Sequence, residues 1–321
     1  MKILVLGAGV IGTIYGQLFA EAGHEVVHYV RAGKSAQYEG GIDVHLLDGR
    51  HTPEQERRIH YLIRVTEQFA PSDGYDLILV SVRHYQLESV LPILARSAGS
   101  TEILFFNGLW TDFSSIDRYL PRQQYLWGYP VAGGALNGCE LTGALMNEVR
   151  LGETDGAHSE RVVRLSKLFE SAQLKVDVRA DMLHWLWMHF AQEAAVIGVG
   201  LKVGDSEHLM TSVGALHEVI LCMRETWQIC AARGIDLKIY ERENAVYYQP
   251  AWFAAGLFKL YFRMHPLERR IMSAHTGVEE LKRIYDDTLA EGKRLGVETP
   301  HFSALKPRVE AYVRSALAGA H

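Results

Sequence analysis

Apolar and polar positions follow two different patterns along the chain, and the change falls near residue 178. Before that point, short apolar runs alternate with amphipathic segments, which is typical of a mainly parallel sheet with covering helices. From Ala180 onward, apolar residues recur at helical spacing and strand patterns are almost absent. The sequence therefore predicts an α/β domain over residues 1–177 and an all-helical domain over residues 178–321.

Individual elements can be placed within the first domain. The run 75–82 is continuously apolar and contains Val and Ile, as expected for a parallel strand covered on both faces. The segment 143–152 has the character of a hairpin strand that finishes the sheet. The predicted strands are 1–6, 24–30, 41–47, 59–65, 75–82, 102–106, 125–134 and 143–152, and the predicted helices are 11–21, 86–95 and 160–172.

A glycine turn joins the first strand to an amphipathic helix, and a second strand follows. The run from Gly7 to Gly12 has the form GxGxxG. In a dinucleotide-binding fold Gly7 permits the tight turn, Gly9 lets the backbone approach a pyrophosphate, and Gly12 lets the helix pack on the strand. The N–H groups at Val10 and Ile11 then open a helix whose N-terminus favours anions. A glycine turn that binds no nucleotide is the alternative interpretation.

The end of the second strand indicates which dinucleotide is bound. An NAD site usually offers Asp or Glu there for the ribose 2′-OH, whereas an NADP site offers Arg. Here the strand ends in Arg31, followed by Lys34, and no acid stands between them. We therefore expect NADP(H), with Arg31 and Lys34 on the 2′-phosphate. Alternatively, both are ordinary solvated loop charges.

Two more polar residues follow buried strands of the predicted sheet. Arg83 follows the strand 75–82, and Asn107 follows the strand 102–106 in an Asn-Gly turn with Gly108. Ligands of open α/β sheets bind beyond the carboxyl ends of the strands. Arg83 and Asn107 are therefore expected to contact the cofactor.

Composition excludes several other classes of protein. The chain has 321 residues, is 48% hydrophobic and 22% charged, and carries a net charge of -5. Without a basic run, this charge argues against nucleic acid or an anionic membrane as partner. The apolar segment 183–201 is interrupted by polar residues, which indicates a buried helix, and no signal peptide is expected at the N-terminus. Three unevenly spaced cysteines fit reduced thiols in a cytoplasmic protein, and no metal site is expected.

These features together resemble ketopantoate reductase (2-dehydropantoate 2-reductase). The resemblance is carried by the glycine turn, Arg31, the turn at Asn107, the helical second half and the closing Gly296-Val297-Glu298-Thr299-Pro300. It implies a Rossmann domain followed by a helical domain of the 6-phosphogluconate-dehydrogenase-like type. It also implies that Asn107 lies beside the nicotinamide and substrate, that Arg83 replaces a cofactor-binding lysine, and that Glu280 matches the family's catalytic-domain glutamate.

The family's catalytic lysine has no counterpart in this alignment. Trp187 stands at the lysine position and Ala191 at that of an asparagine one turn later. Reducing a ketone leaves an alkoxide that needs an acid or a cation. His189 and Glu193, spaced i and i+4 on the same predicted helix, are candidates for that acid, as is Glu280. The other interpretation of His189 and Glu193 is a structural polar pair.

We therefore expect an NADP(H)-dependent oxidoreductase that reduces a carbonyl, such as that of a 2-keto acid, or an imine. Imine reduction needs no proton at the moment of hydride transfer, and Trp187 could face the iminium cation. A non-catalytic NADP(H)-binding sensor or scaffold is the alternative. The aromatic helical domain also predicts a homodimer.

Overall fold

The computed structural model describes residues 1–274 and 277–318. The chain divides into two compact units, unit 1 from Met1 to Leu183 and unit 2 from His184 onward. The functional division expected between residues 177 and 178 stays a prediction. Among the described residues, no helix has the length and apolar character that crossing a membrane requires.

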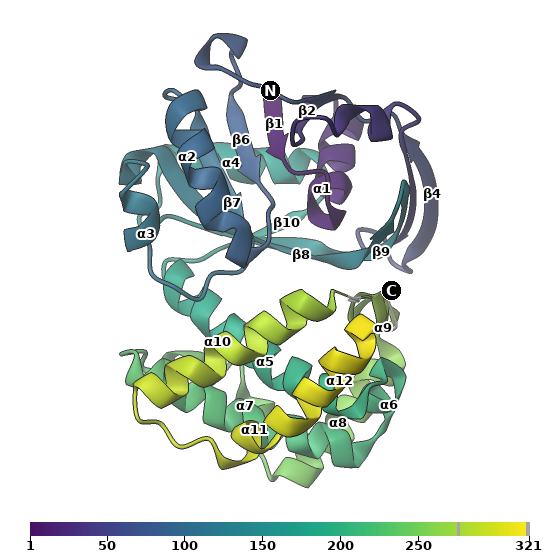
Figure 1. Ribbon diagram of the computed structural model, residues 1–321, viewed down its shortest axis with the longest axis vertical. Helices are drawn as coiled ribbons and strands as arrows, with labels where there is room; N and C mark the ends of the chain where they lie inside the picture. The colour runs from purple at the N-terminus through teal and green to yellow at the C-terminus, as the bar shows by residue number, and fades with distance from the viewer. Residues whose placement is uncertain (275–276, 319–321) are drawn as a thin grey trace. The chain divides into compact units, whose positions relative to one another are not determined.

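Unit 1 is built on one sheet of ten strands (Figure 1). The strands are β1 Lys2–Leu6, β2 Glu25–Tyr29, β3 Ile42–Asp48, β4 Gln55–Tyr61, β5 Val65–Thr66, β6 Leu77–Val80, β7 Glu102–Phe106, β8 Tyr125–Asn137, β9 Glu140–Gly152 and β10 Lys175–Val178. Their order is β4-β3-β9-β8-β7-β6-β1-β2-β5, with β10 paired to β9. The strands from β8 to β5 along this order are parallel, whereas β9 runs antiparallel to β8 and β4 antiparallel to β3.

The strand predicted over residues 59–65 is wrong. Its residues are divided between β4, at one end of the sheet, and β5, which pairs with β2 at the other. β4 begins at Gln55 because it pairs antiparallel with β3, from Asp48↔Gln55 to Ile42↔Tyr61. Its first half is polar and largely exposed, which an edge strand tolerates and an apolar pattern cannot reveal.

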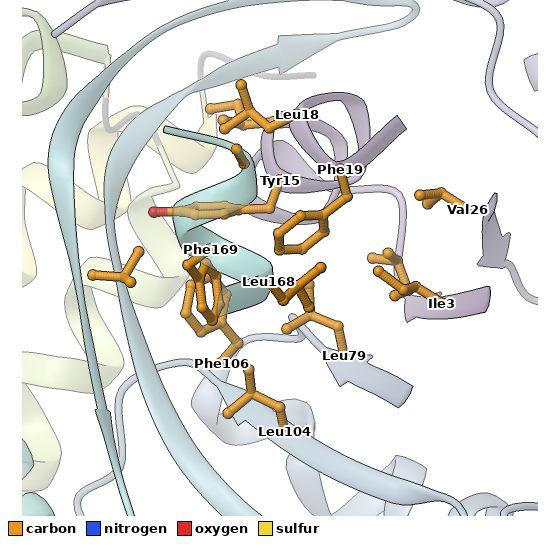
Figure 2. Packing of buried hydrophobic residues seen from close by; sticks show 14 of the residues in the cluster. Ile3, Tyr15, Leu18, Phe19, Val26, Leu79, Leu104, Phe106, Leu168 and Phe169 are labelled. Carbon is orange, nitrogen blue, oxygen red and sulfur yellow. The ribbon is translucent and has the colours of Figure 1, made fainter. Parts of the chain in front are cut away.

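The first helix, α1 (Val10–Glu21), is buried around its whole circumference over residues 12–19, so the expected amphipathic pattern is wrong. The sheet accounts for this burial, because α1 contacts β8 and β9 as well as β1 and β2 (Figure 1). Tyr15 packs edge-on against Phe106, with ring centroids 4.7 Å apart, and Phe19 lies 5.4 Å from Phe169 (Figure 2). The helices α2 (Leu87–Ser97), α3 (Ser114–Asp117) and α4 (Glu160–Ser171) complete unit 1.

Regular structure in the described part of unit 2 is entirely helical, and the predicted order of an α/β domain followed by a helical one is confirmed. Its core includes Trp227, Tyr285 and Phe302, and the Tyr285 hydroxyl donates to the Phe302 carbonyl at 2.8 Å. The helices are α5 Met182–Val203, α6 Ser206–Thr211, α7 Val213–Ala232, α8 Ala251–Met264, α9 Pro266–Ala274, α10 Val278–Arg294, α11 Pro300–Ala304 and α12 Lys306–Ala318.

Candidate functional site

The turn between β1 and α1 requires glycine at two positions. Gly7 has φ +115°, a conformation that other residues rarely adopt, and its N–H donates to the Tyr29 carbonyl at 3.1 Å. A Cβ at Gly12 would lie 2.5 Å from the Gly7 carbonyl oxygen and 2.7 Å from Ser81 Oγ. The helix therefore starts directly against the end of β1 because neither residue carries a side chain.

Gly9 differs from its neighbours because the space beside it is open. A Cβ there would meet no atom within 4 Å, although Gly9 has an ordinary φ of -81° as the N-cap of α1. No side chain caps this helix, and its first turn holds no acidic residue. The backbone N–H groups at the start of α1, at Val10 and Ile11, therefore suit an anionic ligand such as a pyrophosphate.

A buried histidine on β2 contacts the backbone of this turn. His28 on β2 is fully buried, with Nδ1 3.1 Å from the Gly7 carbonyl oxygen and Nε2 3.1 Å from the Tyr61 hydroxyl. Burial lowers the pKa of His28 to about 4, so the ring is neutral near pH 7. A Cβ at Gly16 would lie 2.4 Å from the ring, so Gly16 makes room for His28. Nothing in the glycine motif indicates these partners, and the sequence interpretation missed them.

Arg31 and Lys34 lie on one exposed loop after β2, where the Lys34 N–H donates to the Arg31 carbonyl at 3.1 Å. Both cations are therefore available to a ligand at the end of β2. A carboxylate that the sequence interpretation missed also reaches this loop. Glu67 follows β5, and its Oε1 accepts hydrogen bonds from Ser35 N at 2.9 Å and Ser35 Oγ at 2.6 Å.

Arg83 and Asn107 follow the neighbouring strands β6 and β7, as predicted. Asn107 is 8% exposed, and its Nδ2 donates to the Val82 carbonyl at 2.9 Å, which ties the two strand ends together. Its backbone carbonyl accepts from Trp127 Nε1 at 2.8 Å. The Asn107 Oδ1 is buried without a hydrogen-bond partner among the described residues, so it can accept from a ligand. Arg83 is exposed, and one guanidinium nitrogen donates to the Tyr85 hydroxyl at 2.9 Å.

Trp187 and Ala191 lie on α5, and both are buried. Trp187 is 8% exposed, and the Arg233 guanidinium carbon lies 3.5 Å from the centroid of its ring. The Cys230 thiol lies 3.5 Å from the Trp187 carbonyl oxygen, and the Thr226 hydroxyl donates to the Ala191 carbonyl at 2.9 Å. Trp187 thus already binds a cation of its own chain, which gives it a structural role.

His189 and Glu193 lie on another, partly exposed face of α5. His189 Nε2 is 3.3 Å from Glu193 Oε1, and the imidazole stacks on Trp185 with centroids 4.9 Å apart. The carboxylate and the indole together fix the orientation of the imidazole. Glu280 is also partly exposed, in the first turn of α10.

Comparison with protein families identifies the N-terminal part of the chain. The family model described as "Ketopantoate reductase PanE/ApbA" matches residues 3–156, which include the glycine turn, Arg31, Arg83 and Asn107. Residues 3–156 belong to the ketopantoate reductase PanE/ApbA family. The resemblance drawn from the sequence is confirmed.

Curated relatives of this family align with part of the chain. The uncharacterized oxidoreductase YkpB of Bacillus subtilis is 27% identical over 207 residues, which cover 62% of this chain and 64% of the relative. A 2-dehydropantoate 2-reductase of Pyrococcus abyssi is 23% identical over 214 residues, covering 62% of this chain and 63% of the relative. The chain thus spans less than two thirds of the length of these two relatives.

Solved structures share the fold of this chain over nearly its whole length. A ternary structure of D-mandelate dehydrogenase with NADH and anilino(oxo)acetate has a TM-score of 0.75 at 16% identity, covering 98% of this chain and 99% of that one. The 2-dehydropantoate 2-reductase from Geobacter metallireducens has a TM-score of 0.72 at 16% identity, covering 97% and 99%. At this identity the likeness establishes the fold.

Within the PanE/ApbA domain, the structure groups the predicted residues in three places. These places are the glycine turn, the loop of Arg31 and Lys34, and the strand ends at Arg83 and Asn107. His189 and Glu280 belong to unit 2. The structure brings His189 together with Glu193, as the i,i+4 spacing predicts.

Proposed function

We propose that this protein is an NADP(H)-dependent oxidoreductase that transfers hydride to the carbonyl of a small 2-keto acid. The observation that carries the proposal is the glycine turn inside a PanE/ApbA domain, with open space at Gly9 and an uncapped helix N-terminus beside it. A nicotinamide cofactor supplies the hydride when it is bound. The residues of the chain bind and orient the reactants and deliver the proton.

The cofactor-binding residues divide by the part of the cofactor they contact. The glycine turn, with the N–H groups of Val10 and Ile11, binds the pyrophosphate. Arg31 and Lys34 bind the 2′-phosphate, which favours NADP(H) over NAD(H). Asn107, with its unpaired Oδ1, orients the nicotinamide or the substrate, and Arg83 contributes a further cationic contact.

His189 is the proposed general acid. An imidazole can donate a proton to a substrate oxygen, and Glu193 Oε1, 3.3 Å from Nε2, orients the ring of His189. Protonating that oxygen neutralises the alkoxide formed by hydride transfer. Glu280 is the second candidate for this role.

Names of the similar proteins support a 2-oxo acid as substrate class. Relatives and a solved neighbour are named 2-dehydropantoate 2-reductase, and another neighbour is a D-mandelate dehydrogenase in complex with anilino(oxo)acetate. The compounds in these names, 2-dehydropantoate and anilino(oxo)acetate, both have an oxidised carbon next to a carboxylate. An imine is the other substrate class to test, although the packing of Arg233 on Trp187 leaves no special role for that ring.

We also propose a homodimer. Exposed apolar side chains gather on one helix of unit 2, and contiguous exposed apolar surface of this kind typically marks an interface. A ketopantoate reductase from Staphylococcus aureus with a TM-score of 0.61 is named as dimeric. The exposed apolar residues of α8 include Trp252, Phe253, Leu257, Leu260 and Met264.

The direct test is NADPH consumption with a panel of 2-keto acids, including ketopantoate, and with mixtures of a 2-keto acid and an amine. His189→Ala should lower turnover by roughly 10²–10⁴-fold on the preferred substrate, whereas His184→Ala, an exposed histidine on the same helix, should change it little. Firm NADPH binding with no consumption on any member of the panel would contradict the proposed reaction.

A further inference from the structure

The loop that follows β2 is hydrogen-bonded to a carboxylate from a neighbouring strand. β5 pairs in parallel with β2, with Tyr29 opposite Thr66, and the Val30 N–H donates to the Thr66 carbonyl at 2.9 Å. Glu67 is the next residue after β5. This pairing therefore delivers the Glu67 carboxylate to the loop that carries Arg31 and Lys34.

Several donors of the loop converge on Glu67. The Ser35 hydroxyl and N–H both bond to Oε1, at 2.6 and 2.9 Å. Hydrogen bonds from the Ser35 hydroxyl, and from the backbone N–H groups of Gly33, Ser35 and Lys34, lower the pKa of Glu67 to about 2. Glu67 is therefore a fixed negative charge throughout the neutral pH range.

Those donors are of the kind that a phosphate group would use. Backbone N–H groups and a serine hydroxyl next to Arg31 and Lys34 suit the 2′-phosphate of NADP(H). A carboxylate already bonded to them competes for the same donors and repels a phosphate dianion. The free 2′-OH of NAD(H) carries no charge and can donate to a carboxylate, which is how acids act in many NAD sites.

We infer that Glu67 sets the cofactor specificity of this site, by weakening the binding of NADP(H) relative to NAD(H). The inference rests on the proposed nicotinamide-cofactor function. Arg31 and Lys34 act in the opposite direction, so the preference of the wild-type protein for NADP(H) is the difference between their attraction and the repulsion from Glu67.

Glu67→Gln tests this inference because glutamine keeps an acceptor oxygen for Ser35 and removes only the charge. The dissociation constant for NADPH should fall by about tenfold, as expected from removing one like charge close to a phosphate at an exposed site, while that for NADH stays equal or rises. Arg31→Ala should change the ratio of the two constants in the opposite direction. Glu39→Gln is the matched control, since it removes one exposed carboxylate from the segment following this loop.

The measurement is a fluorescence or calorimetric titration of each variant with NADPH, with NADH, and with adenosine fragments that carry or lack the 2′-phosphate. The inference predicts that Glu67→Gln strengthens only the phosphorylated fragment and NADPH, and that Glu39→Gln leaves the ratio unchanged. An unchanged ratio in Glu67→Gln, or an equal loss for both cofactors, would overturn it and leave Glu67 as a structural support of the loop. If neither cofactor binds the wild-type protein, the proposed function itself fails.

Discussion

Gly12→Ala is expected to destabilise unit 1 through steric conflict in the turn after β1. The new Cβ would lie 2.5 Å from the Gly7 carbonyl oxygen, 2.7 Å from Ser81 Oγ and 3.2 Å from Val5 Cγ1. Overpacking of this kind costs roughly 1–3 kcal/mol, and a backbone carbonyl cannot rotate away. Alanine regains about 1 kcal/mol of helix propensity. The net loss of up to about 2 kcal/mol would lower the melting temperature of a unit this size by up to roughly 8 °C.

Gly9→Ala is the matched variant, because it adds the same methyl group two residues beyond Gly7. No atom lies within 4 Å of the new Cβ, and a φ of -81° is ordinary for alanine. The stability loss should stay below about 1 kcal/mol, the cost of a poorer N-cap. If a pyrophosphate lies over Gly9, the methyl group should separate it from the helix N-terminus and weaken cofactor binding by roughly 10–100-fold.

The assay pairs thermal unfolding with cofactor titration for the wild type and both variants. We expect Gly12→Ala to melt at a lower temperature than the wild type. We expect Gly9→Ala to melt close to the wild type and to bind the cofactor more weakly. If Gly9→Ala binds NADPH as tightly as the wild type, the turn does not hold the pyrophosphate. A wild-type melting temperature in Gly12→Ala would mean that the backbone relaxes more easily than the contacts at Gly12 imply.

Three further predictions concern other parts of the chain. Asn107→Ala should lower turnover by roughly tenfold or more at saturating cofactor while costing only about 1 kcal/mol of stability, the worth of its bond to Val82; a large stability loss with unchanged turnover would make it only a turn residue. The folded-state pKa of His28, about 4, lies below its unfolded value, so stability is lost as pH falls from about 6.5 toward 4. In urea unfolding, the free energy of unfolding of the wild type should be about 2 kcal/mol lower at pH 5 than at pH 7. His28→Asn should abolish this difference, and its persistence in that variant would refute the burial argument. Leu260→Glu should shift the sedimentation of a dimer toward that of a monomer, whereas Leu62→Glu, exposed on unit 1, should not; equal behaviour would exclude α8 as the interface.

Much of the fold could be predicted because strands and helices leave local periods in the sequence. The central strands are buried on both faces and appear as continuous apolar runs, as 75–82 does around β6. The edge of the sheet could not be predicted in the same way. β4 begins with the polar segment Gln55–Arg58, and only its pairing with β3 makes it a strand.

The candidate cofactor site could be predicted only where its residues lie in or directly after the glycine motif and the strand that follows it. The glycine turn and Arg31 follow from the order strand, turn, helix, strand. Glu67 could not be inferred, because the acid of an NAD site is expected at the end of β2. Glu67 instead follows β5, a two-residue strand that is joined to β2 by pairing alone. The spacing of residues along the chain does not predict the contact between Glu67 and the loop after β2.

The residues of α5 that were considered for catalysis lie on different faces of the helix. Successive residues of a helix are rotated by about 100°, so Trp187 and His189 point to nearly opposite sides of α5, about 160° apart. The resemblance to ketopantoate reductase implies a lysine at position 187, yet the structure buries Trp187 against Arg233 and leaves His189 partly exposed beside Glu193. His189 on α5 and Glu280 on α10 therefore stay the candidates for the acid that the proposed reduction needs.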